Sequence, residues 1–240
     1  NLSGTDLTNI ILRDPETGQD AALLTGVNLR IARLVEVDLS NLDLSHASLV
    51  GATLDNVMLR RTKLVGADLT LVNLSAADLR DADLSNARLD GADLRKANLS
   101  GVNLRDAQLN TAIMGDQKKV VRLTGAKLQA AILTGADLRN VEMDHVDLSY
   151  ANLQAAILRY SKLRRSNLRE ANLKGADLSA ADLTEADLRR ADLTEAALNF
   201  AQLGKTDLRR AVLVDVDLCK ADLTGAILEG ATVEAVVLDE

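Results

Sequence analysis

Leucine recurs at every fifth position through most of this chain, usually with a small residue two positions before it. The segment 176–193 reads ADLSAADLTEADLRRADL, in which each unit is a small residue, Asp or Asn, Leu and two variable residues. We call the central leucine position i. A five-residue period matches neither the 3.6-residue period of an amphipathic helix nor the two-residue period of a strand. The pattern therefore predicts a repeat array.

The repeat keeps its phase through three runs. Its centres run from Leu2 to Leu12, from Leu24 to Met114 and from Leu123 to Leu238, which gives 46 units with Leu at 43 centres. Seven extra residues separate the first two runs, and four separate the last two. The polar segments at these places are 13–20, with the only proline, and 115–120. Because the repeat resumes after each, we predict two short loop insertions in a single domain, 1–240.

The alternation of side chains in extended backbone assigns an inside and an outside to each unit. Positions i−2 and i share a face and are predicted to point inward, whereas i−1 points outward. Positions i+1 and i+2 must turn the chain, and i+1 residues such as Ser179 are expected to face solvent. Of 14 glycines, 11 occupy i+2, where a turn needs a positive φ. The Asp or Asn at i−1 is suited to hydrogen-bond nearby backbone. We predict an all-β coil of short strands and turns, with little helix.

The repeated Ala-Asp/Asn-Leu-x-x unit resembles the pentapeptide repeat family over almost the whole chain. This resemblance implies a right-handed quadrilateral β-helix, in which four pentapeptides form the four sides of one coil. On that basis the 46 units would make about eleven and a half coils.

Charge singles out two parts of the chain. The net charge is −7, and residues 211–240 hold seven acids against one base, Lys220. This acidic end argues against direct nucleic-acid binding. With four units per coil, five arginines fall on one side of three successive coils, which makes them a candidate interaction surface; the alternative is an ordinary solvated face. They are Arg169, Arg189, Arg190, Arg209 and Arg210.

Two aromatic residues form a second candidate surface. Tyr160 and Phe200 both take position i+2 and are expected on one side, two coils apart. The alternative is that each ring packs over a corner of its coil.

No pattern indicates catalysis or a cofactor. The carboxylates recur with the repeat, whereas an active site needs one special place. The two histidines, His46 and His145, lie far apart and have no partner at metal-ligand spacing. The single cysteine, Cys219, is expected to be an ordinary surface thiol. No nucleotide-binding or Ser-His-Asp motif is present. We expect no enzyme, no cofactor and no metal.

A non-enzymatic scaffold that binds a protein partner is the function that these features favour. The resemblance supplies an alternative, because some family members imitate DNA and protect bacterial DNA gyrase. Those relatives often have Phe at the centre and a C-terminal helix, whereas here the centre is Leu and 232–238 keeps the repeat. Outside 211–240 the chain is also almost neutral, with 28 acids and 27 bases.

Two missing features, a long apolar stretch and polar end caps, bear on the location and assembly of the protein. No stretch of 18 apolar residues is present, so no membrane span is expected. We expect a cytoplasmic location, with a processed lumenal or periplasmic form as the alternative. Because the repeat runs to both ends without a polar cap, two interpretations are open: capping segments are missing from this sequence, or the end coils associate with something, for example by end-to-end self-association.

Overall fold

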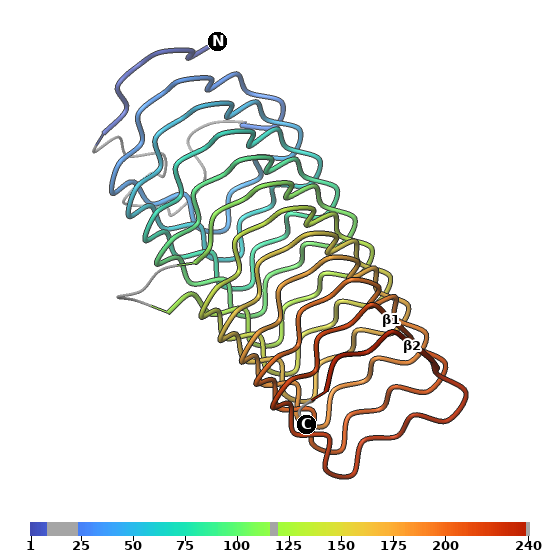
Figure 1. Cartoon of the computed structure of the whole chain (residues 1–240). Helices are drawn as coiled ribbons and strands as arrows, with labels where there is room; N and C mark the ends of the chain where they lie inside the picture. Colours follow the sequence, from blue (N-terminus) through green and yellow to red (C-terminus); the bar gives the residue numbers. More distant parts are fainter. Residues whose placement is uncertain (9–23, 116–119, 239–240) are drawn as a thin grey trace.

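The computed structural model describes residues 1–8, 24–115 and 120–238, and shows one rod of stacked coils (Figure 1). No helix occurs in these residues. Two strands long enough to be named, β1 (Val212–Val214) and β2 (Thr232–Glu234), pair in parallel with Val212 opposite Thr232. Elsewhere neighbouring coils meet in single parallel bridges at position i−1. The all-β prediction is confirmed, whereas the handedness and the total number of coils stay predictions.

Each coil contains twenty residues, which is four pentapeptides. The parallel bridges join residues twenty apart, for example Asp177 with Ala197. At two places the step is longer: Asp6 pairs with Arg33, 27 positions later, and Asn98 pairs with Arg122, 24 positions later. The seven and four extra residues are therefore insertions that leave the stacking of coils intact. The predicted centre Leu12, the segment 13–20 and most of 115–120 lie outside the described residues.

Columns of leucine and small residues fill the interior. Position i is 0–2% exposed from Leu29 to Leu213, and most i−2 positions are alanines with equally low exposure. These side chains form one continuous core cluster, as the alternation predicted. Where i−2 is polar the hydroxyl is satisfied: Thr62 Oγ1 donates to the Leu39 carbonyl at 2.8 Å, and Ser166 Oγ to that of Met143 at 2.8 Å. A buried hydroxyl without such a bond would be destabilising.

Backbone hydrogen bonds close each corner and join each coil to the next. In one unit, the Ala181 N–H donates to the Leu178 carbonyl at 3.0 Å, and the Leu178 N–H donates to Ala197 of the next coil at 2.8 Å. The residue at i+2 of this turn has a positive φ of 55° at Ala180. Positive φ at its third residue is typical of a type II turn. The preference for glycine at i+2 thus has the predicted cause, although many larger residues also adopt this conformation here.

The i−1 side chain forms the local bond that was predicted. Asp177 Oδ1 accepts from the backbone N–H of Ser179 at 3.1 Å and from its hydroxyl at 2.6 Å. The expectation that Ser179 faces solvent was wrong, because this residue is only 8% exposed. Its hydroxyl also lies 2.5 Å from Asn199 Oδ1 of the next coil. A short polar side chain at i+1 therefore folds back onto the Asp instead of extending into water.

The coil formed by the last described residues is less covered than the others. Leu223 is half-buried, and the i residues Leu228, Val233 and Leu238 are 40%, 54% and 59% exposed. Their apolar side chains form an end face that includes Val233 of β2.

Candidate interaction surface

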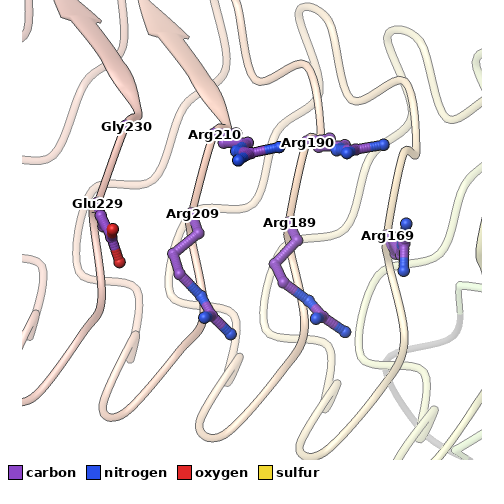
Figure 2. A pocket seen from close by; sticks show the side chains of 7 residues that line it. All are labelled: Arg169, Arg189, Arg190, Arg209, Arg210, Glu229 and Gly230. Carbon is purple, nitrogen blue, oxygen red and sulfur yellow. The ribbon is translucent and has the colours of Figure 1, made fainter.

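The twenty-residue coil brings the five predicted arginines together at one corner. Arg169, Arg189 and Arg209 occupy i+1 in three successive coils, and Arg190 and Arg210 occupy the neighbouring i+2 positions. The Arg190 N–H donates to the Arg209 carbonyl at 3.1 Å, which places these coils side by side. With Glu229 and Gly230 the arginines line an open groove of about 380 Å³ (Figure 2). We call these seven residues the arginine groove.

Two of the three i+1 arginines, Arg189 and Arg209, are held by the aspartate of their own pentapeptide, whereas Arg169 has Asn167 at that place. Arg209 donates from Nε to Asp207 Oδ1 at 2.9 Å and from Nη2 to Oδ2 at 2.6 Å. Arg189 makes the same two-pronged contact with Asp187. The hydrogen bond from Arg209, against an opposing effect of burial, lowers the pKa of Asp207 below its usual value. Such bidentate pairs fix the guanidinium plane as well as neutralising its charge. Figure 2 shows the two side chains lying parallel.

The i+2 arginines have fewer partners. Arg190 Nη1 lies 3.2 Å from Glu170 Oε1, and Arg169 Nε lies 3.3 Å from the same oxygen. One carboxylate oxygen is thus shared by two guanidinium groups. Within the described residues, Arg210 has no ion pair with any acid. The row from Arg190 to Arg210 therefore has one ion pair, with Glu170, for two positive charges, while Glu229 in the same groove interacts with Arg209. Figure 2 shows the Arg190 and Arg210 side chains following one another along the rod.

Tyr160 and Phe200 lie at a different corner. They stand two coils apart in one i+2 column, as predicted, and are 58% and 54% exposed. Two pentapeptides separate this column from that of the arginine groove, which is half a coil. Each ring has a cation beside it: Arg159 is 5.9 Å from the Tyr160 centroid, and Lys220 is 5.3 Å from that of Phe200. The two aromatics therefore do not extend the arginine groove.

The sequence interpretation missed other residues that belong with the arginines. Tyr150 and Glu170 occupy the same i+2 column as Arg190, since the Tyr150 N–H donates to the Arg169 carbonyl and the Glu170 N–H to that of Arg189. Tyr150 is 58% exposed. Counting back by twenty from Arg190 would have found both.

A second groove offers a useful comparison. Near the other end of the rod, Asp38, Ser40, Asn41, Met58, Arg60, Arg61, Arg80 and Asp81 line an opening of about 390 Å³. Its lining includes three arginines and two aspartates. Arg60 and Arg80 both donate to Asp78, at 2.6 and 2.7 Å. Positive charge there is more evenly matched than in the arginine groove.

The single cysteine and the candidate metal-binding residues are scattered over the described part of the rod. Cys219 is half-buried, and its backbone N–H donates to Asp217. Among the residues that the structure describes, no group of three or more His, Cys, Asp or Glu is placed to hold a metal ion. Nor does any described segment form a helix suited to crossing a membrane.

The pentapeptide units of this chain match a known family model. Eight copies of the model for pentapeptide repeats match residues 22–57, 38–75, 77–116, 122–159, 147–184, 161–199, 171–210 and 196–234. The chain belongs to the pentapeptide repeat family. Members of this family are generally non-catalytic.

Solved structures similar to this pentapeptide repeat protein come from cyanobacteria and a plant. HetL of Nostoc sp. strain PCC 7120, a pentapeptide repeat protein involved in heterocyst differentiation regulation, is 35% identical over 89% of this chain and 90% of its own, with a TM-score of 0.28. A protein of the Arabidopsis thaliana thylakoid lumen is 35% identical over 44% of this chain and 68% of its own, with a TM-score of 0.34.

More distant similarity is found to QnrB1, a plasmid-mediated fluoroquinolone resistance protein. It is 17% identical over 89% of this chain and 90% of its own, with a TM-score of 0.34. The comparison with curated protein sequences gives no match.

Proposed function

We propose that this pentapeptide repeat protein is a non-enzymatic scaffold that binds a protein partner through the arginine groove. The observation that supports the proposal is the row Arg190–Arg210, for which the shared Glu170 carboxylate is the one ion-pair partner among the residues that the structure describes. Arginine is enriched at protein interfaces, and exposed charge of one sign steers the approach of an oppositely charged surface. A rod with a continuous leucine core holds such groups at fixed spacing.

Affinity capture from the source cell tests this function. The bait is compared with R190Q/R210Q and with R60Q/R61Q, a control that removes the same charge from the second groove. We expect at least one protein to be retained by the unchanged bait and by the control, and lost from R190Q/R210Q. If both variants retain the same proteins as the unchanged bait, the arginine groove is not the binding surface and the proposal is wrong.

The alternative function, imitation of DNA toward gyrase, requires rows of uncompensated acids. Along much of the rod the acids are instead paired with arginines, as Asp187 and Asp207 are with Arg189 and Arg209. A duplex carries about one negative charge per 1.7 Å of its length. We therefore expect purified protein at micromolar concentration to leave gyrase supercoiling and quinolone-stabilised cleavage unchanged. Inhibition or protection in that assay would favour the alternative.

A further inference from the structure

We propose that the arginine groove binds an acidic α-helix of a partner protein, with carboxylates three or four residues apart facing Arg190 and Arg210. This inference rests on the proposed scaffold function and adds the chemistry and shape of the partner. It is carried by the pairing pattern of the arginines, by the spacing of the coils and by the neighbouring Tyr150.

The pairing pattern shows which groups are open to a ligand. Arg189 and Arg209 bind Asp187 and Asp207, and in each arginine both Nε and Nη2 already donate to the carboxylate. Arg190 keeps about half of its side chain exposed, 49%, while contacting Glu170 through one nitrogen. Arg210 meets no carboxylate within the described part of the chain. Because two like charges stand on adjacent coils, an incoming anion relieves their repulsion as well as pairing with each.

The spacing of the row selects the shape of the ligand. Successive coils are separated by the usual distance between strands, about 4.8 Å. In an α-helix, residues three and four apart rise by about 4.5 and 6.0 Å and share a face. Residues on one face of an extended strand are about 6.6 Å apart. Carboxylates three residues apart in a helix lying along the rod therefore match the spacing of Arg190 and Arg210 to within about 0.3 Å, whereas the spacing on one face of a strand differs by about 1.8 Å.

The same i+2 column also indicates where an apolar residue of the partner helix should lie. Beyond Arg190 it continues to Glu170, whose carboxylate is already shared, and then to the exposed ring of Tyr150. Tyr150 is three coils from Arg210, about 14 Å, which corresponds to roughly ten residues of helix. A partner helix should therefore have an apolar residue about three turns away from its first acid. Tyrosine is well suited to such a contact because its ring is large and loses little conformational freedom.

Fluorescence anisotropy with designed peptides tests the inference. The probe is a labelled alanine-based helical peptide with glutamates at n and n+3, which match the two arginines without placing a third carboxylate over Glu170. One comparison peptide has the glutamates replaced by glutamine, and another has the same number of glutamates at alternate positions with prolines that prevent a helix. A single-stranded DNA oligonucleotide serves as a polyanion without carboxylates. All are titrated with the full chain at low and at physiological ionic strength.

We expect the helical acidic probe to bind more tightly than the three comparison ligands. R190Q/R210Q should weaken its binding by about tenfold, whereas R60Q/R61Q should change it by less than about twofold. R190K/R210K, which keeps the charge without the planar fork, should recover part of the loss. Unchanged circular dichroism and melting temperature establish that each variant is folded.

Three results would overturn the inference: no binding of the helical probe, equal binding of the extended peptide or the oligonucleotide, or an affinity that R190Q/R210Q leaves unchanged. These failures are distinguishable from failure of the scaffold function. If a captured protein still depends on the arginine groove while the helical probe does not bind, the groove is an interaction surface for a partner of another shape.

Discussion

Removal of one central leucine side chain, by Leu153→Ala, tests the account of the core. Leu153 is fully buried between Leu133 and Leu173 of the adjacent coils, all three with 0% exposure. The loss combines the transfer of the deleted carbons with a term for the cavity that remains, and such substitutions destabilise by about 2–5 kcal/mol. The site cannot easily collapse, because its backbone is bonded to the next coil, with the Leu153 N–H donating to Asn172 at 2.7 Å. We therefore expect about 3–4 kcal/mol.

Urea unfolding followed by circular dichroism measures this loss, and hydrogen exchange of the neighbouring amides locates it. Exchange is needed because long repeat arrays do not always unfold in one cooperative step. Two controls introduce alanine at other positions. Gln154→Ala, at an exposed i+1 position, should change stability by less than about 0.5 kcal/mol, and Leu223→Ala, half-buried near the end face, should fall between the two. Equal losses for Leu153→Ala and Gln154→Ala would refute the inside–outside assignment.

Three further predictions concern turns, acid stability and assembly. Gly175→Ala should cost about 1 kcal/mol for its positive φ alone, and Gly91→Ala slightly more, because its new Cβ would lie 2.7 Å from Leu71 Cδ2; Leu71→Ala should remove that difference in urea titrations. Hydrogen bonds from two arginines, against an opposing effect of burial, lower the pKa of Asp78 from 3.8 to about 2. The stability that this gives, about 1–2 kcal/mol once solvent screening is allowed for, is present above about pH 4 and is lost between about pH 4 and 2, so Asp78→Asn should flatten the dependence of melting temperature on pH in that range. Exposed end-face side chains predict concentration-dependent association in sedimentation, which Leu228→Lys should abolish; a monomer at all concentrations would contradict this.

Most of the fold could be predicted because one local rule repeats. The two-residue alternation fixes which positions are inside, and the need for positive φ explains the glycines at i+2. The lengths of the two insertions were also predictable, since the coil must resume its register: the pairs Asp6–Arg33 and Asn98–Arg122 show the expected seven and four extra residues. The sequence alone did not specify the handedness, which came only from the family resemblance.

Side-chain placement at the corners was harder to predict, because it depends on contacts between coils. Ser179 was assigned to solvent from its position in the turn, but bonds to Asp177 and Asn199 cover it. Tyr150 was overlooked beside the arginines, although it lies in their column. In both cases the missing information was which residues stand twenty positions away, since a pentapeptide read alone does not show its neighbours.

The aspartate at i−1, which stabilises the turn, also influences which arginines of a coil have a carboxylate partner. At i−1 it accepts the backbone N–H of i+1, and its second oxygen remains open to an arginine at i+1, as Asp207 is to Arg209. Where i−1 is Asp, an arginine at i+1 can therefore be neutralised within its own unit, as Arg189 and Arg209 are; Arg169, which follows Asn167, pairs with Glu170 instead. An arginine at i+2 has no such built-in partner, and its compensation depends on the residue twenty positions away, as Arg190 depends on Glu170. Binding specificity can thus change at i+2 without disturbing the leucine core or the turns, which is why we place the partner contact at Arg190 and Arg210.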